Sequence, residues 1–443
     1  MAHLVSRRTR LVLANGYLIN SICQQRLNLS RYHYSKMLTF THTSGIDAEP
    51  VERYKPGGYH PITLYETLKD DRYKVLHELG YGGYSTTWAA MDQKTNSYVA
   101  VKVIVADPPV TTELNVLEAV SALPKTHPGS CHIIQLLDHF TVDGPNGSHE
   151  CLVMEIAGPN VQDSLGAYRY NGLPATLAKV VAKQVLQGLD FLAVYGIAHG
   201  DLHTKNIVLA LPDLSSLSEK DFVARLGEIA TGAVTRIDGR PLEDNFPNQI
   251  IRPASFRGFD NILSRPSVKI IDFGQAFLGN NAPTTLQNPV YLQPPEVVFG
   301  DLLDRRVDLW SAGCLIFELI TGQPPFDTLG QTPPLLVEQM LEELSEELPS
   351  RWQAKWEVMH KELVERRANR KSTPEDDVED EIFTLHEWLE ECYYFDDKKP
   401  GFTKEELASM AEEIGSMMRF EPSLRATPAD VLAHDMFREK ISS

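Results

Sequence analysis

The sequence predicts an α+β fold with two lobes, a small β-rich lobe followed by a larger helical lobe. Three observations support this fold class. From Tyr73 the chain consists of short β-branched and aromatic runs broken by Gly-rich and Asn-containing turns, as an antiparallel sheet requires. After Gly158 the spacing of apolar residues becomes helical, as in LAKVVAKQVLQGLDFLAVYG. The 443 residues are 42% apolar and 23% charged, which is a globular composition and excludes disorder throughout.

The first 46 residues have the composition of a mitochondrial transit peptide. They hold interspersed Leu, Ile and Tyr, no acidic residue, and six basic residues: Arg7, Arg8, Arg10, Arg26, Arg31 and Lys36. Three other interpretations stay open, namely a disordered basic arm, an untranslated leader before a start at Met37, and a short helix packed on the domain. Residues 47–72 are expected to form an N-terminal extension.

The charge balance limits the classes of partner. Lys and Arg total 42 against 60 Asp and Glu, and the net charge of −18 argues against a nucleic-acid or anionic-membrane binder. The five cysteines include no CxxC pair, which supports neither a zinc site nor a disulfide framework. The longest uncharged apolar stretch, near Leu309 to Phe317, is too short to span a membrane.

The small lobe is assigned to residues 73–156. A helical stretch is expected from Thr111 to Ala122. Two further strand-like runs, Ile133 to Phe140 and Glu150 to Ile156, flank the turn DGPNGS. The lobe boundary is therefore expected near Glu155 to Gly158.

The larger lobe is assigned to residues 157–441. The stretch 211–266 contains Ser, Pro and Asp and is too long for a plain connection, so we interpret it as an insertion. Within it, Ser218 to Leu226 is a candidate helix, because its first residue and Asp221 resemble a capping box with the acid variant at the last position. The charge run around 364–381 is expected to be a solvated loop.

A Gly-rich turn between two strand-like runs is the first candidate for nucleotide binding. Glycine lets the backbone approach phosphates without an intervening Cβ, and Lys102, in VAVK on the next strand, would neutralise the α- and β-phosphates. Taken alone, a plain β-hairpin with a surface lysine explains the pattern as well. The residues of the turn assigned to the nucleotide are Leu79, Gly80, Tyr81, Gly82, Gly83, Tyr84, Ser85, Thr86 and Thr87.

Two later motifs supply acid–base and metal chemistry. HGDLHTKN places Asp201 and Asn206 in a loop after a long helix, which is a general base followed by a neutral oxygen ligand for magnesium. IIDFGQA places Asp272 after an apolar strand-like run, where a carboxylate would bind the metal that bridges the β- and γ-phosphates. The order of Gly-rich turn, VAVK, HGD and DFG predicts a phosphoryl-transfer site that binds nucleotide phosphates and Mg²⁺.

With these motifs the chain resembles a eukaryotic protein kinase from about Tyr73 to Phe437. The supporting motifs are PPE, DLWSAGCLIFEL and EPSLRATPADVLAHDMF. The resemblance implies a buried ion pair between Glu296 and Arg425. It also implies that Glu113 holds Lys102, with Glu118 as an alternative.

The resemblance further assigns Met154 and Glu155 to nucleotide binding. Met154 ends the CLVM strand and would lie at the back of the adenine pocket. An ordinary core methionine is the alternative, and it differs only in what the side chain touches.

Within the kinases, the runs YHPITLYETLKDDRYKVLHELGYGGYSTTW, GPNGSHECLVME and HGDLHTKNIVLALPDLSSLS are similar to the SR-protein-specific kinases, particularly the fungal ones. That subgroup has serine in place of the third loop glycine, as Ser85 has here, and an insertion before the DFG-type motif. It implies a protein substrate with basic Arg/Ser-rich segments, and a location in the cytoplasm or nucleus. An acidic stretch at residues 338–347 would favour such a substrate, and an exposed helix face explains the stretch equally well. No direct nucleic-acid partner and a monomer are expected.

Several positions depart from the usual kinase pattern. Gly200 replaces the arginine before the catalytic Asp, so activity should not need an activation-loop phosphate. His203 stands where serine/threonine kinases carry lysine, and Lys205 is expected to stabilise the transferred charge instead. Because QNPVYLQPPE departs from the usual substrate-positioning segment, serine/threonine specificity depends on the subgroup resemblance.

The leading interpretation is an ATP- and magnesium-dependent serine/threonine protein kinase. Asp201 would deprotonate the substrate hydroxyl, Lys102 and Glu113 would position the nucleotide, and Asn206 and Asp272 would carry the metal. One alternative is a small-molecule phosphotransferase, because HGDLH also occurs in aminoglycoside- and choline-kinase-like enzymes. Another is a pseudokinase scaffold, which would be expected to lose Lys102, Asp201 or Asp272.

Overall fold

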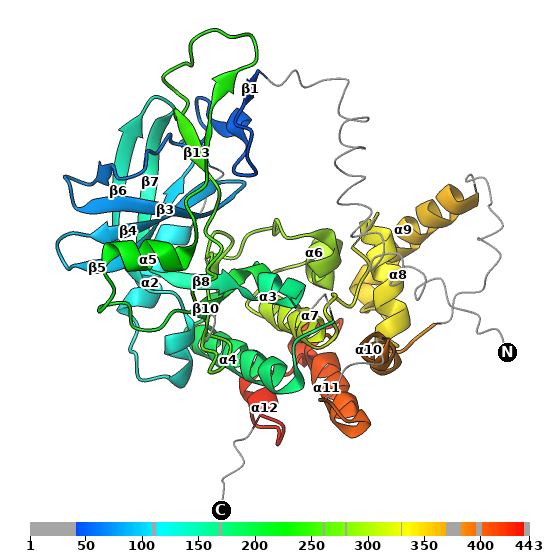
Figure 1. The fold of residues 1–443 in the computed structure, drawn as a ribbon. Coiled ribbons are helices and arrows are strands. Elements are labelled where there is room, and N and C mark those ends of the chain that lie inside the picture. The colour runs from blue at the N-terminus through cyan, green and yellow to red at the C-terminus, as the bar shows by residue number, and fades with distance from the viewer. Residues whose placement is uncertain are drawn as a thin grey trace, which may run out of the picture. The chain divides into compact units, whose positions relative to one another are not determined.

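The computed structural model describes most of the chain after the predicted leader (Figure 1). The described residues are 41–108, 112–167, 171–259, 262–279, 281–328, 330–368, 382–395 and 401–437. Residues 1–40 of the predicted leader, and 369–381 of the predicted charged loop, lie outside them.

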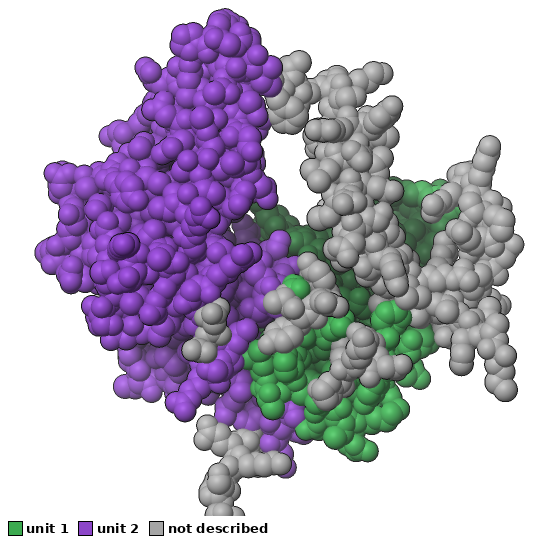
Figure 2. All heavy atoms as spheres, viewed as in Figure 1, with its two compact units in different colours: residues 1–39, 165–178, 282–427 green, residues 40–164, 179–281, 428–443 purple. Residues whose placement is uncertain are grey.

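The chain divides into two compact units, each assembled from segments that are distant in sequence (Figure 2). Unit 2 takes residues 40–164, 179–281 and 428–443, and unit 1 takes, among the described residues, 165–178 and 282–427. The two units are described separately below.

A six-stranded antiparallel sheet dominates unit 2, with the strand order β2-β3-β4-β5-β7-β6. Its strands are β2 (Thr67–Leu68), β3 (Tyr73–Gly82), β4 (Ser85–Asp92), β5 (Ser97–Ile104), β6 (Leu136–Gly144) and β7 (Gly147–Glu155). The antiparallel sheet predicted from Tyr73 is confirmed, and helix α2 (Glu113–Ala122) follows β5. β6 begins after the predicted Ile133, which instead forms a bridge with Ile270.

One apolar cluster of this sheet is covered by the stretch predicted as an insertion. Helix α5 (Glu219–Leu226) starts where the sequence predicts, and the Ser218 hydroxyl accepts a hydrogen bond from the Asp221 amide. Its Phe222 is fully buried and stacks on Tyr98 of β5, with 3.8 Å between ring centroids. This cluster joins residues of the sheet to residues far along the chain: Leu76, Ala89, Tyr98, Leu214, Phe222, Leu226 and Phe259.

Three further strands of unit 2 position the predicted catalytic and metal-binding segments. β8 (Ala157–Asn160), β10 (Ile207–Ala210) and β14 (Val268–Ile270) form an antiparallel sheet in the order β14-β10-β8. Gln184, on the predicted long helix α4 (Ala175–Val194), accepts a hydrogen bond from the Val268 amide at 2.8 Å and donates to the Pro266 carbonyl. The helix thereby fixes the start of β14.

The segment before the sheet also pairs with the insertion. β1 (His42–Thr43) pairs with β12 (Thr235–Arg236), and η1 (Val51–Arg53) follows β1. Within the insertion, β11 (Thr231–Ala233) pairs antiparallel with β13 (Gln249–Ile251). Two short strands, β9 (Ile197–Ala198) and β15 (Phe277–Leu278), pair near the catalytic loop.

Unit 1 is helical. It contains α6 (Pro295–Phe299), α7 (Val307–Thr321), α8 (Pro333–Leu344), α9 (Ser350–Ala368), α10 (Leu385–Tyr394) and α11 (Lys404–Met417). Every residue of α7, which carries DLWSAGCLIFEL, is buried. The implied ion pair is present, because Arg425 donates to both carboxylate oxygens of buried Glu296 at 2.7 and 2.6 Å. Within the described part of the chain, no helix combines the length and apolar character needed to cross a membrane.

Candidate active site

Lys102 lies between two carboxylates in unit 2. It stands on β5 opposite Thr87 of β4, and its Nζ is 2.7 Å from Glu113 Oε1 and 3.0 Å from Asp272 Oδ1. Glu113 is the first residue of α2, so the packing of that helix sets its position. The predicted contact with Glu113 is confirmed, whereas Glu118 lies 3.3 Å from the ring of His139.

The charges in this cluster perturb one another strongly. Burial alone would lower the pKa of Lys102, but the nearby charges of Asp272 and Glu113 outweigh burial and raise it. The charge of Lys102 is also the main reason that the pKa of Asp272 falls to about 2. Burial raises the pKa of Glu113 although Lys102 acts in the opposite direction. The cluster thus holds a cation at the point where a nucleotide would bring further negative charge.

Asp201 lies in the loop between β9 and β10, and its two carboxylate oxygens have different surroundings. Its Oδ1 is buried and has no hydrogen-bond partner among the described residues. Its amide donates to His199 Nδ1 at 3.3 Å, and the other nitrogen of that ring lies 2.9 Å from the Ile271 carbonyl. A buried, unsatisfied acceptor is costly, which is the expected condition of a group that waits for a substrate hydroxyl.

His203 is also part of this loop, although the sequence marks it only as a departure from the usual lysine. Its Nδ1 accepts a hydrogen bond from the Lys205 amide, so Nε2 carries the proton of a neutral ring. That Nε2 lies 3.6 Å from Asp201 Oδ2 and 3.3 Å from Asn206 Nδ2. The side chain of Lys205, in η3 (Thr204–Asn206), is exposed, and its role in transfer stays a prediction.

The oxygens of Asn206 and Asp272 fit a magnesium ion. The Ile271 amide donates to the Asn206 carbonyl at 2.9 Å, which places Asn206 beside the residue that precedes Asp272. The side-chain nitrogen Nδ2 of Asn206 donates to the backbone carbonyl of Asp201, so the side-chain oxygen Oδ1 can face a metal. The Asp272 carboxylate is half-exposed, and Lys102 binds only its Oδ1. The other oxygen, Oδ2, is a carboxylate oxygen of the kind that hard cations such as Mg²⁺ prefer.

The backbone at Asp272 is held in an uncommon conformation. Its φ is 63°, in the left-handed region that non-glycine residues rarely adopt. The next residue, Phe273, is fully buried and meets the His199 ring edge-on at 5.0 Å between centroids. Backbone strain of this kind is concentrated at functional sites, where the surrounding packing maintains it.

No cluster of three or more His, Cys, Asp or Glu suited to hold a metal occurs in the described residues. An ion on Asn206 and Asp272 would therefore need phosphate oxygens and water to complete its shell. This requirement is consistent with a metal that arrives with a nucleotide.

The predicted Gly-rich turn is the β3–β4 hairpin, in which Gly82 pairs with Ser85. Gly80, Gly82 and Gly83 have open space where a Cβ would point, so their backbone is accessible. Not every side chain assigned to the nucleotide faces it. The Thr86 hydroxyl is buried and accepts a hydrogen bond from Trp88 Nε1.

Met154 and Glu155, the other two residues assigned to nucleotide binding, are both on β7. Met154 is buried and pairs with Ala100 on β5. The Glu155 carboxylate binds Lys269 at 2.8 Å and the Gln135 amide at 2.9 Å. These contacts occupy the Glu155 side chain, and the Glu155 backbone amide donates to the Gln135 carbonyl at 3.1 Å.

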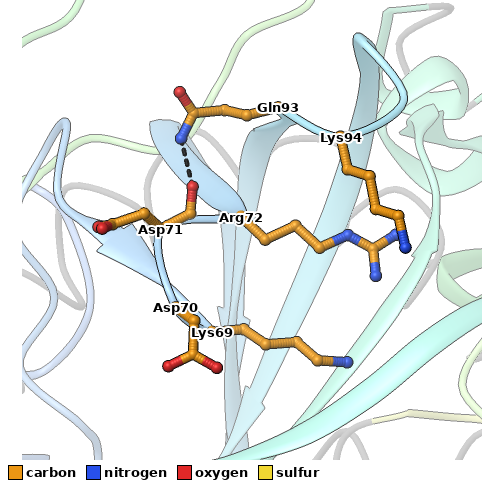
Figure 3. Close-up of a pocket in the computed structure, with 6 residues that line it drawn as sticks. All are labelled: Lys69, Asp70, Asp71, Arg72, Gln93 and Lys94. Carbon is orange, nitrogen blue, oxygen red and sulfur yellow. Dashed lines mark hydrogen bonds between the residues drawn. The ribbon is translucent and has the colours of Figure 1, made fainter.

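Unit 2 also has a surface pocket, and none of its lining residues is one assigned to the nucleotide, the metal or catalysis (Figure 3). It is lined by Lys69, Asp70, Asp71, Arg72, Gln93 and Lys94. Lys69 and Arg72 are both bound to Asp138, and Arg72 is also bound to Asp92.

Comparison with known proteins agrees with this geometry. Residues 73–222 and 259–437 match the family described as protein kinase domain. A crystal structure of a kinase domain superposes with a TM-score of 0.56 at 20% identity, covering 86% of this chain and 99% of that one. This structure supports the fold alone.

The curated relatives indicate a subgroup within the protein kinases. The serine/threonine-protein kinase SRPK of Physarum polycephalum is 32% identical over 62% of this chain and 66% of its own length. Protein kinase dsk1 of Schizosaccharomyces pombe is 27% identical over 63% of this chain and 66% of its length. SRSF protein kinase 3 of Homo sapiens is 34% identical over 38% of this chain and 30% of its length. The matches thus span two thirds or less of these relatives. The chain belongs to the protein kinase family, and the predicted resemblance to the SRPK-type kinases is confirmed.

Proposed function

We propose that this protein transfers the γ-phosphate of ATP to serine and threonine hydroxyls of protein substrates, preferentially in basic Arg/Ser-rich segments. The observation that supports the proposal most directly is Lys102, held between Glu113 and Asp272 within 3.0 Å. One carboxylate is enough to neutralise the charge of a buried lysine, so the second carboxylate needs another explanation. The arrangement is explained if, once a nucleotide binds, Asp272 coordinates the metal and Lys102 binds phosphate oxygens.

Each remaining residue has a distinct role in this proposal. Asp201 accepts the proton of the substrate hydroxyl through its unpartnered Oδ1. Asn206 and Asp272 supply oxygen ligands to Mg²⁺, which neutralises phosphate charge when bound. Lys205 and His203 flank the transferred group on the loop, and Lys205 carries the permanent positive charge.

The preference for basic substrates has support from charge and from relatives, but not from the acidic stretch at 338–347. The whole chain carries −18, which favours basic partners at long range. In unit 1, however, Glu343 is buried, Glu338 binds Arg367, and Glu346 binds Arg419. Much of that stretch therefore serves the fold of unit 1. The cytoplasmic or nuclear location, with mitochondrial import as the alternative, and the monomeric state stay predictions.

The proposal is tested by transfer of labelled phosphate from Mg-ATP to three acceptors: an Arg/Ser repeat peptide, a basic protein without such repeats, and an aminoglycoside. Asp201→Asn should lower kcat by about 10²- to 10⁴-fold, because the base is lost while the side-chain shape is kept. Asp70→Asn, at an exposed aspartate of the surface pocket, is the matched control and should leave kcat unchanged.

The acceptors separate the alternatives. Selective labelling of the repeat peptide supports the whole proposal, and equal labelling of both proteins contradicts only the Arg/Ser preference. Labelling of the aminoglycoside alone would show a small-molecule phosphotransferase. ATP binding without any transfer would show a pseudokinase.

A further inference from the structure

The N-terminal segment of residues 49–59, here called the strap, contacts the Gly-rich turn directly. The Tyr59 hydroxyl donates a hydrogen bond to the Gly82 carbonyl at 2.5 Å, and the Arg53 guanidinium donates to the Gly83 carbonyl. The Arg53 guanidinium also lies 5.2 Å from the centre of the Tyr59 ring. Two adjacent peptide groups of the turn are thus bound from one side by the strap.

These contacts fix the direction of two backbone amides. In a trans peptide the C=O and N–H groups point in opposite directions. Since the carbonyls of Gly82 and Gly83 point to the strap, the N–H groups of Gly83 and Tyr84 point away from it. Neither N–H has an acceptor within the part of the chain that the structure describes. Paired unsatisfied amides at a Gly-rich turn are donors suited to phosphate oxygens.

The strap is itself held firmly. The Asn146 side chain, in the β6–β7 turn, donates to the Tyr59 carbonyl at 2.7 Å, and the Gly57 amide donates to the Asn146 carbonyl at 2.8 Å. From the insertion, Asn245 donates to the Tyr54 carbonyl at 2.9 Å. Within the strap, the Tyr54 hydroxyl donates to the buried Glu49 carboxylate at 2.6 Å. A segment bound at several points can impose one position on a turn that glycine leaves free.

We infer that Tyr59 and Arg53 are positioning residues that orient the Gly83 and Tyr84 amides toward the phosphates of ATP. Both residues precede the kinase domain matched by the family, which begins at residue 73. The inference rests on the proposed ATP-dependent function. It adds that phosphate recognition depends on a segment outside the matched domain.

The test compares ATP with adenosine, which has no phosphates. Tyr59→Phe removes only the hydroxyl and keeps the buried ring, and Arg53→Met removes the guanidinium and keeps the aliphatic stem. Each variant should weaken Mg-ATP binding by about threefold to tenfold, the loss of one hydrogen bond, with adenosine affinity unchanged. KM for ATP should rise in proportion while KM for the protein substrate stays the same.

Tyr98→Phe is the matched control. The Tyr98 hydroxyl also donates to a backbone carbonyl, that of Leu217 at 3.0 Å, but away from the turn. Its ratio of ATP to adenosine affinity should equal that of the wild type. Mg-ATP should slow amide hydrogen exchange at Gly83 and Tyr84 less in Tyr59→Phe than in the wild type, and to the wild-type extent in Tyr98→Phe.

The outcomes are distinct. Loss of ATP affinity alone supports the positioning role. An equal loss for ATP and adenosine, or no loss for either, would overturn it while the proposed function stands. If the wild-type protein binds no Mg-ATP, the proposed function fails and the inference fails with it.

Discussion

At the residue scale, the structure buries two carboxyl groups side by side beneath the Gly-rich turn. Glu78, on β3, and Glu49, on the strap, are both buried, and Tyr54 donates to Glu49. Burial, followed by the neighbouring charge of Glu49, raises the pKa of Glu78 to about 10, and burial also raises the pKa of Glu49. One carboxyl is therefore protonated near neutral pH and can donate to the other, which gives a partner to two of the three buried oxygens that otherwise have none.

This pair predicts a pH dependence of stability. Because the folded pKa of Glu78 lies above its unfolded value, its stabilising effect is complete below about pH 4.5 and declines as the pH rises toward 10. Glu78→Gln keeps the shape and removes the titration, so at pH 8 it should raise the free energy of unfolding by about 1 kcal/mol or more. Chemical denaturation at pH 5 and pH 8 checks this. A variant less stable than wild type at pH 8 would contradict the shared proton.

At the element scale, helix α5 is stabilised both by an N-cap hydrogen bond and by the burial of an aromatic ring, and one substitution removes each contribution. Ser218→Ala removes the cap and should cost about 1 kcal/mol. Phe222→Ala removes the ring that stacks on Tyr98 in the core and should cost about 3–5 kcal/mol. Thermal unfolding of both variants tests whether the insertion is integral to the sheet. Equal, small losses would show that α5 is only loosely attached.

The elements also show where sequence prediction succeeds and where it stops. Strands β3, β4 and β5, helix α4 and the cap of α5 follow from periodicity and local polar residues, and all were predictable. The pairing of β1 with β12 was not, because two-residue strands have no periodicity. The contact between Asn245 and the Tyr54 carbonyl joins residues 191 positions apart, and no local pattern specifies it.

The same division applies to the candidate site. The contact between Lys102 and Glu113 was implied by the resemblance to protein kinases, whereas the ion pair between Lys102 and Asp272 was not predicted. Tyr59 and Arg53 contact the Gly-rich turn from outside the predicted catalytic motifs. Tyr59 is the first residue of the recognised run YHPITLYE, but nothing in that run indicated a contact with the turn. The sequence shows that His203 replaces the usual lysine. Its distance to Asp201, however, depends on the backbone conformation of the loop, which no sequence pattern specifies.

At the scale of the whole molecule, the order of synthesis differs from the order of packing. The last strand of the six-stranded sheet ends at Glu155, yet the apolar cluster on Leu76 and Tyr98 is covered by residues up to Phe259. A growing chain therefore exposes this apolar surface while the ribosome makes the intervening segment. At about 5–20 residues per second, the exposure lasts on the order of ten seconds.

Stalled nascent chains provide the measurement. Protease resistance of the sheet should appear only when Phe259 has left the exit tunnel, and a chain exposed only to Ala210 should be digested. Resistance at the shorter length would show that the sheet needs no cover. If the longer chain is required, the nascent protein depends for that interval on chaperones that shield apolar surface, and the insertion sets how long the chain stays dependent on them.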